Sequence, residues 1–302
     1  MDATALLDHC SNAMQDAGLT FGHGTENATD EAAWLVSAGL GIAPGDGFPE
    51  GDVSVDEAQR ILSLLERRIS SRAPLAYVLG EAWFCGLRFE VNDQVLVPRS
   101  PIAELIQSRF EPWLDPETTV EILDLCTGSG ALAVATALAM PAARLVASDI
   151  SAAALQVARK NAQLHEVDKR ITFFRSDLFA QLPTQAFDLI LSNPPYVSKD
   201  VFAALPGEYQ AEPELALVSA AGGLEIPLRI MKDAARYLSP QGVLICEVGE
   251  SAEALHRALP GVALTWIDFD RGGDGVFIMD REQLLVHRSR LETALEAQAN
   301  VI

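Results

Sequence analysis

The chain has 302 residues, 49% of them hydrophobic, and a formal net charge of −20 from 42 acidic and 22 basic residues. Its length allows one large domain with a smaller one, and its hydrophobic content argues against global disorder. The charge argues against direct nucleic-acid binding, which needs clustered lysine and arginine, and suits a basic protein partner or simply solubility.

Residues 1–79 are predicted to be helical. Apolar residues recur at helical spacing, Thr29-Asp30-Glu31 resembles a helix start, and the Gly- and Pro-rich stretch 41–51 predicts a connection. Ser54 begins a strongly amphipathic helix, and Pro74 ends that region. We expect a small helical domain here, with either a substrate-recognition role or a packing role only.

Residues 80–98 predict a β-hairpin that links two domains. The segment 83–91 alternates aromatic and aliphatic side chains, Asn92-Asp93 is a turn signal, and a second apolar run covers 95–97. The irregular stretch 98–101, with two prolines, follows the hairpin.

From residue 119 strands and helices alternate. Strands are predicted at 120–125, 144–148, 171–174, 187–192 and 242–248, helices at 131–140, 151–164, 224–238 and 252–258, a closing pair of strands at 263–269 and 275–279, and a terminal helix at 281–302. Such alternation implies an α/β fold with a mainly parallel, doubly wound sheet and helices on both faces. We place this domain at 99–302.

The turn after the first of these strands is rich in glycine. It contains Cys126, Thr127, Gly128, Ser129 and Gly130, and its glycines let the backbone approach a ligand without a Cβ in the way. The spacing is neither that of a dinucleotide fingerprint nor that of a phosphate loop, which disfavours pyrophosphate binding.

Two acidic residues end the next two strands. Asp149 lies 19 residues after Gly130, where a carboxylate can accept both hydroxyls of a ribose. The Asp177 carboxylate, together with Leu178 and Phe179, can hold the edge and face of an adenine. A plain turn with capping aspartates is the structural alternative. Together, the three strand ends describe a pocket for adenosine without pyrophosphate, and we therefore expect S-adenosylmethionine as cofactor.

The tetrapeptide Asn193-Pro194-Pro195-Tyr196 follows the fourth strand and is the centre of the predicted catalytic site. Consecutive prolines make a stiff loop, at the sheet edge where open α/β sheets bind ligands. The Asn193 amide oxygen and the Pro194 carbonyl can accept both hydrogens of a planar –NH2 group, and Tyr196 can stack on that group. The loop would thus align a nitrogen for in-line attack on a methyl group, and either glutamine or adenine satisfies this requirement.

The cysteines and the distribution of apolar residues indicate the cellular compartment of the protein. The four cysteines form no Cys-x-x-Cys pair, so we expect no metal site and no disulfide framework, as in a reducing compartment. Asp2 and Asp8 interrupt the first apolar stretch, unlike a signal peptide, and no segment has the ~18 continuous apolar residues of a membrane span. We expect a cytoplasmic protein with no membrane partner.

Four motifs, taken in order, resemble those of the class I methyltransferases of the HemK/PrmC/PrmB group, which are protein-glutamine N5-methyltransferases. The motifs are Asp124–Gly130, Ser148–Ser151, Ser176–Phe179 and Asn193–Tyr196. The resemblance extends over nearly the whole chain, including the helical N-terminal region. It implies cofactor contacts at Cys126–Gly130, Asp149, Asp177, Leu178 and Asn193, and a glutamine-binding loop at Asn193–Tyr196.

The group has one branch that acts on release factors and another that acts on the third large-subunit ribosomal protein. Segments 95–106, 205–217 and 272–277, together with Cys126, resemble the ribosomal branch. Leu178 stands where release-factor enzymes often place an aromatic, which argues against stacking on adenine at that position. The implied partner is a basic large-subunit ribosomal protein, methylated before assembly.

The resemblance also suggests that Arg99 and Glu104 line the acceptor channel. A surface charge at Arg99 and a helix-face carboxylate at Glu104 are the alternatives.

Three other functions stay open on sequence grounds. A nucleic-acid adenine N6-methyltransferase would offer the same –NH2 group to Asn193, although the charge of −20 disfavours it. A release-factor glutamine methyltransferase shares all of the chemistry and differs in partner. A non-catalytic protein that keeps the cofactor fold is disfavoured, because all four motifs are intact.

Overall fold

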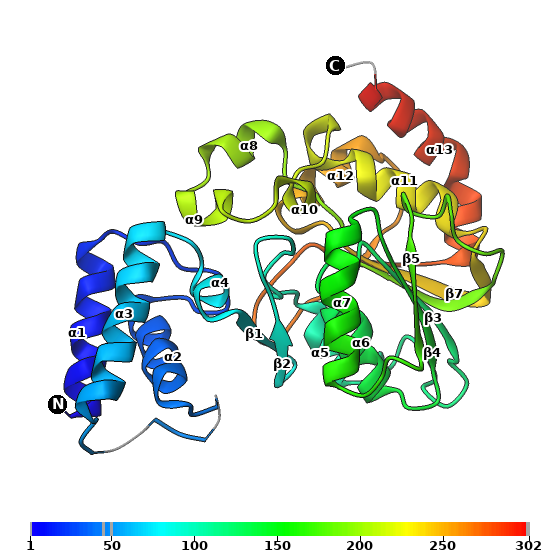
Figure 1. The fold of residues 1–302 in the computed structure, drawn as a ribbon. Helices are drawn as coiled ribbons and strands as arrows, with labels where there is room; N and C mark the ends of the chain where they lie inside the picture. Colours follow the sequence, from blue (N-terminus) through cyan, green and yellow to red (C-terminus); the bar gives the residue numbers. More distant parts are fainter. Residues whose placement is uncertain (1, 44–45, 49–50, 300–302) are drawn as a thin grey trace.

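The computed structural model describes residues 2–43, 46–48 and 51–299. The N-terminal helices stand to one side of an α/β body, and the β1–β2 hairpin lies between them (Figure 1). No helix in the described part of the chain has both the length and the apolar character needed to cross a membrane.

The N-terminal helices form their own small core. They are α1 (Ala3–Asp16), α2 (Ala28–Leu40), α3 (Val55–Ser71) and α4 (Leu75–Leu79). Ser54 and Glu57 form a capping box at the start of α3. The start of α2 lies slightly before the predicted Thr29, because the Asn27 side chain accepts the Asp30 backbone N–H at 2.9 Å. Part of the predicted 41–51 connection lies outside the described residues.

The hairpin is shorter than predicted, and the predicted position of its turn is wrong. Strands β1 (Glu81–Phe84) and β2 (Leu87–Glu90) pair around Cys85 and Gly86, whose φ values are +53° and +75°. Positive φ at both central residues is the geometry of a two-residue hairpin turn. Because Cys85 is apolar, it continues the alternating pattern of residues 83–91, and the sequence therefore gives no sign of a turn there. Segment 95–97 forms no strand, although Val95 and Val97 are buried.

The central sheet has the order β5-β4-β3-β6-β7-β9-β8. Its strands are β3 (Glu121–Leu125), β4 (Arg144–Asp149), β5 (Ile171–Arg175), β6 (Phe187–Ser192), β7 (Leu238–Glu247), β8 (Thr265–Trp266) and β9 (Val276–Asp280). Strands β3 to β7 are parallel, and β9 and β8 close the sheet in antiparallel pairs. The predicted doubly wound α/β class is confirmed, although β8 covers only two residues of the predicted 263–269.

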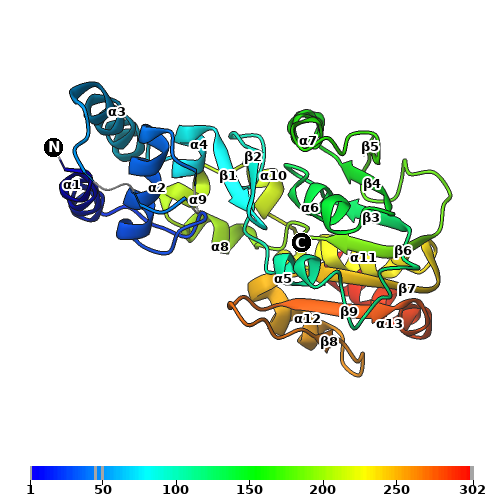
Figure 2. The same ribbon diagram turned by 90° about the horizontal axis from the view of Figure 1, so that it is seen from below.

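Helices cover both faces of this sheet (Figures 1 and 2). Helices α5 (Ile102–Gln107), α6 (Ala131–Ala139) and α7 (Ala152–Leu164) pack on one face, and α11 (Glu225–Ala234), α12 (Ala252–Ala258) and α13 (Arg281–Ala299) pack on the other. The helix predicted over 224–238 ends at Ala234, because Leu238 already pairs with Phe187 as the start of β7. The last predicted residues of the terminal helix, 300–302, lie outside the described residues.

A long excursion leaves the sheet after β6. It contains α8 (Lys199–Ala204), α9 (Gly207–Gln210) and α10 (Glu214–Leu217), and we call residues 198–217 the α8–α10 segment. Its base is closed by the bonds Val197 N–H to Leu217 O, 2.8 Å, and Ser219 N–H to Val197 O, 2.9 Å. The segment extends towards the N-terminal helices, with α9 beside α4 in both views (Figures 1 and 2).

Candidate active site

The sheet register brings four strand ends to one level. Ser148, Leu125, Ser192 and Cys246 are neighbours across β4, β3, β6 and β7. The residues that follow these four therefore lie at one level of the sheet, each beside the next, and they are Asp149, Cys126, Asn193 and Glu247. The chain runs outward from β3 to β5 and then returns to β6 on the other side of β3. Such a switch point is where open α/β sheets bind ligands.

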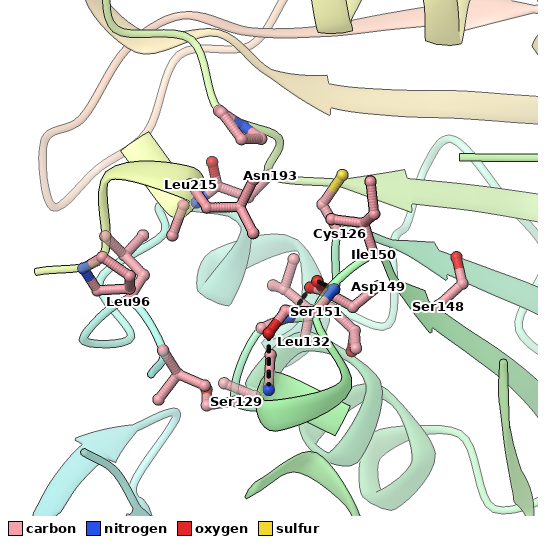
Figure 3. Close-up of a pocket in the computed structure, with 18 of the residues that line it drawn as sticks. Leu96, Cys126, Ser129, Leu132, Ser148, Asp149, Ile150, Ser151, Asn193 and Leu215 are labelled. Carbon is pink, nitrogen blue, oxygen red and sulfur yellow. Dashed lines mark hydrogen bonds between the residues drawn. The ribbon is translucent and has the colours of Figure 1, made fainter. Parts of the chain in front are cut away.

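A cavity of about 460 Å³ opens at this level. Its size is within the ~300–1,000 Å³ typical of small-molecule sites. Every predicted cofactor residue lines it except Gly130, which lies directly behind the turn. Figure 3 shows Asp149, Ile150 and Ser151 on one side of the cavity, with Asn193 and Leu215 across from them. We call it the donor cavity.

The glycine-rich turn is held from below by a buried carboxylate. Thr127 donates its hydroxyl to Asp124 at 2.5 Å, and Asp124 is wholly buried in β3. Burial raises the pKa of Asp124 to about 7. A Cβ on Gly130, which has φ +79°, would come within 3.0 Å of the Ala158 side chain, so the glycine allows α6 and α7 to approach closely. This packing explains why Gly130 supports the cavity without lining it.

Asp149 joins the turn to the second strand end. Its carboxylate accepts the backbone N–H of Gly128 at 2.9 Å and that of Ser151 at 2.8 Å (Figure 3). Burial raises the pKa of Asp149 despite these bonds. Each carboxylate oxygen still has a lone pair for a further donor, which is what binding a pair of ribose hydroxyls requires. Ser151, and not Asp149, caps α7.

Asp177 lines the donor cavity with a partner that the sequence did not predict. Both of its carboxylate oxygens accept from Arg229 Nη2, at 2.9 and 2.8 Å, and Arg229 also lines the cavity. Leu178 is buried beside it and provides an apolar wall together with Ile226 and Ile150. An adenine here would contact aliphatic side chains, in agreement with the expectation of no aromatic stacking at Leu178.

A second cavity of about 230 Å³ lies on the other side of Asn193. Pro194, Tyr196 and Glu247 line it, whereas Pro195 faces the donor cavity. Asn193 lines both cavities, so it stands at their boundary. We call the smaller one the acceptor cavity.

Glu247 is a site residue that the sequence analysis missed. It is buried at the end of β7, where it lies beside Asn193, accepts the Tyr196 hydroxyl at 3.1 Å and accepts the Ser100 hydroxyl at 2.5 Å. Burial raises the pKa of Glu247 to about 7, even though these donors lower it. A glutamate that ends a run of buried apolar residues at 243–246 was the signal available in the sequence.

Tyr196 is fixed by close backbone approaches. Ser251 donates its hydroxyl to the Tyr196 carbonyl at 2.7 Å. A Cβ on Gly249 would lie 2.7 Å from the Tyr196 ring, and a Cβ on Gly223 would lie 2.1 Å from the Tyr196 carbonyl oxygen. The loop has little freedom to move, which is what alignment of an acceptor requires.

Gly223→Ala is expected to lower methyl transfer at least about tenfold, because a displacement of ~1 Å at a reacting centre can cost two orders of magnitude. Gly223 has φ +95°, and its new Cβ would push the Tyr196 carbonyl. The matched control is Gly222→Ala, which has φ +66° and nothing within 4 Å of its Cβ. The control should lose at most about 1 kcal/mol of stability and keep its activity. Equal turnover in both variants, compared at equal folded fraction, would contradict this role for Gly223.

Arg99 connects the site to the N-terminal helices. It lines both cavities and forms two bonds to Glu212, at 2.8 and 2.6 Å. Glu212 also accepts the Val97 N–H at 3.0 Å and lies 3.3 Å from His23 Nε2. Burial would raise the pKa of Glu212, but the nearby His23 and the hydrogen bonds from Arg99 hold this pKa below its usual value. Arg99 is therefore a cavity residue, as the resemblance suggested.

Glu104 is placed differently from the expectation. It accepts the backbone N–H groups of Asp270 and Arg271, at 3.0 and 2.9 Å, and lines neither cavity. Its role is to hold the loop before β9. Among the described residues, no group of three or more His, Cys, Asp or Glu side chains is arranged to hold a metal ion.

A doubly wound sheet with a donor cavity at its switch point, bounded by Asn-Pro-Pro-Tyr and a second cavity, defines the chain as a class I methyltransferase. The PrmC N-terminal domain family matches residues 5–80, and the methyltransferase small domain family matches residues 109–205. A methyltransferase of Pyrococcus furiosus has a similar structure, at 17% identity and a TM-score of 0.48 over 74% of this chain and 98% of that one.

Closer relatives cover nearly the full length. A protein of Xanthomonas campestris pv. campestris named ribosomal protein uL3 glutamine methyltransferase is 43% identical, over 97% of this chain and 96% of its own length. A protein of Bordetella pertussis with the same name is 42% identical, over 92% of this chain and 95% of its own. The chain belongs to the family of ribosomal protein uL3 glutamine methyltransferases.

Proposed function

We propose that this enzyme transfers a methyl group from S-adenosylmethionine to the side-chain amide nitrogen (N5) of a glutamine in ribosomal protein uL3. The position of Asn193 at the boundary of the donor and acceptor cavities carries the proposal. The names of the full-length relatives support glutamine in uL3 as the acceptor.

The donor cavity fits the cofactor. Asp149 keeps free lone pairs for the ribose hydroxyls, and the Cys126–Gly130 turn presents its backbone to the cavity. Ile150, Leu178 and Ile226 offer aliphatic surface to an adenine, and the Asp177–Arg229 pair closes that side. When bound, S-adenosylmethionine supplies an electrophilic methyl group on a positively charged sulfur.

The acceptor cavity fits a planar amide. The Asn193 amide oxygen and the Pro194 carbonyl accept the two hydrogens of the glutamine –NH2, which directs the nitrogen towards the donor cavity. Tyr196 packs on the amide plane. Burial raises the pKa of Tyr196, which stays neutral at physiological pH and does not act as a base. The nitrogen becomes cationic as it gains the methyl group and then releases one proton to water, so no strong base is needed.

The partner is a basic ribosomal protein that the enzyme meets in the cytoplasm, before assembly hides the glutamine. A net charge of −20 favours the approach of a basic chain and disfavours free nucleic acid. The helical region 1–79 contributes to recognising this partner.

The test incubates purified enzyme and methyl-labelled S-adenosylmethionine with isolated uL3, with release factors and with ribosomal RNA. Label on a single glutamine of uL3 is expected, together with its loss when that glutamine is replaced by glutamate. Label on release factors alone would overturn the partner, and label on RNA alone would overturn the glutamine acceptor.

A further inference from the structure

We propose that Glu247 is a positioning residue of the transfer reaction: its carboxylate accepts the amide N–H of Asn193 and thereby turns the Asn193 oxygen towards the acceptor. This inference rests on the proposed function. It assigns the orientation of Asn193 to a side chain on the neighbouring strand.

The sheet itself makes the contact. Ser192 pairs with Cys246 in the parallel β6–β7 ladder, so the next residues, Asn193 and Glu247, lie side by side. The Asn193 side chain is close enough to Glu247 to lower the pKa of its carboxyl group, and both residues line the acceptor cavity. No flexible loop is needed to bring the two groups together.

An asparagine amide can lie in two orientations that differ by exchange of its oxygen and nitrogen, and only one of them suits an acceptor –NH2 group. An ionised carboxylate can only accept hydrogen bonds. It therefore attracts the NH2 end of Asn193 and leaves the oxygen for the substrate.

The other partners of Glu247 point their protons at it as well. The Ser100 hydroxyl accepts the Ile102 N–H at 3.2 Å, which leaves its own proton for Glu247. The Tyr196 hydroxyl donates at 3.1 Å. A protonated Glu247 would have to donate to one of its three partners, and the Asn193 amide would lose its single orientation.

The charges around Glu247 determine the pH at which it becomes protonated. Arg99 is the positive charge that favours ionised Glu247, but Glu212 pairs with Arg99 on its other side. Tyr196 is neutral, and Glu250 is exposed at the rim of the acceptor cavity. The buried thiol of Cys246 precedes Glu247 on the same strand, with its pKa raised by burial and by this carboxylate. Burial is the strongest of these influences and opposes ionisation of Glu247, so that its pKa is about 7.

Ionised Glu247 also contributes a negative charge beside the cavity in which the acceptor nitrogen becomes cationic. A fixed opposite charge at such a position stabilises the transition state without reorganisation. The orientation of Asn193 and this charge are lost together when Glu247 is protonated or replaced.

The test compares wild type with Glu247→Gln and with the charge-matched control Glu253→Gln, whose side chain is 83% exposed on α12. At pH 8 we expect kcat to fall about 10- to 100-fold in Glu247→Gln, with cofactor affinity within about threefold of wild type. The wild-type kcat should fall about tenfold per pH unit below pH 7, and this acid limb should be absent from Glu247→Gln. Ser100→Ala should move the limb to higher pH, because the Ser100 hydrogen bond lowers the pKa of Glu247.

Thermal unfolding gives a readout that does not depend on activity. The folded-state pKa of about 7 lies above the ordinary value of 4.5, so ionised Glu247 destabilises the fold. This penalty is absent below pH 4.5, grows between pH 4.5 and 7, and is fully present above pH 7. The melting temperature of Glu247→Gln relative to wild type should therefore rise from pH 5 to pH 8, whereas that of Glu253→Gln should not.

Two outcomes would overturn the inference. The first is that Glu247→Gln keeps the kcat of wild type and the acid limb of its pH profile. The second is that kcat falls only in proportion to a loss of folded protein. If wild type methylates no glutamine, the proposed function fails instead, and the unfolding curves still report whether Glu247 titrates near pH 7.

Discussion

Alanine in place of Asn193 is expected to lower kcat for methyl transfer by about two orders of magnitude or more, while the dissociation constant of S-adenosylmethionine changes only a few-fold. Asn193 lies between the cavities. In the proposed reaction its amide is the group that directs the acceptor nitrogen. Most of the donor cavity is built by other strand ends. Single-turnover transfer to uL3 and calorimetric titration with the cofactor measure the two effects separately.

Asp149→Ala is expected to show the opposite pattern, with a large loss of cofactor affinity and a smaller loss of kcat. Loss of a charge-assisted hydrogen bond is worth about 1.5–3 kcal/mol, or roughly 10- to 150-fold in the dissociation constant of the cofactor. With saturating cofactor, its kcat should recover further than that of Asn193→Ala. Wild-type turnover in Asn193→Ala would be incompatible with the role given to the amide.

Arg68→Met is expected to destabilise the protein by about 3–5 kcal/mol, since it leaves a buried carboxylate unpaired. Arg68 is wholly buried in α3, with its Nε 2.7 Å from Glu31 and an Nη2 bond of 3.2 Å to the Thr20 carbonyl. Glu31 is buried as well, with Thr25 as its further donor. Urea denaturation followed by circular dichroism gives the free energy of unfolding.

The matched control is Arg257→Met, which breaks the exposed Arg257–Glu253 pair on α12 and should cost at most about 0.5 kcal/mol. A second variant, Arg68→Met combined with Glu31→Gln, should recover a large part of the loss, because the buried charge is gone. A loss in Arg68→Met no greater than in Arg257→Met would show that the buried pair does not stabilise the N-terminal helices.

The parts of the site that follow one another along the chain were predictable. The Cys126–Gly130 turn, Asp149 and the Asn193–Tyr196 loop each end a strand, and parallel strands end at the same edge, so order along the chain was enough to bring them together. Alternating elements likewise predicted the doubly wound sheet. The family resemblance drawn from these motifs is confirmed by the full-length relatives.

The missed features depend on pairs that are distant in sequence. Glu247 became a site residue through the register of β6 and β7, and Asp177 acquired Arg229 through the packing of α11. Neither pair leaves a local pattern, because an acidic residue in a strand or a basic one on a helix is equally consistent with solvent exposure. The hairpin turn was misplaced for another reason, since an apolar Cys85 at a turn imitates a strand residue.

The α8–α10 segment has a consequence for kinetics. It begins directly after the Asn193–Tyr196 loop, and two of its buried carboxylates bind the N-terminal side. Glu208 pairs with Arg72 at 2.7 Å and accepts the Thr20 N–H at 3.1 Å, while Glu212 lies against His23. These contacts connect the N-terminal helices to the Asn193–Tyr196 loop, so a protein that docks on those helices can affect the position of the loop. Part of its binding energy can then be used to align the glutamine instead of tightening the complex. A short peptide around the same glutamine lacks that contribution, and we expect it to be a slow substrate as well as a weak one.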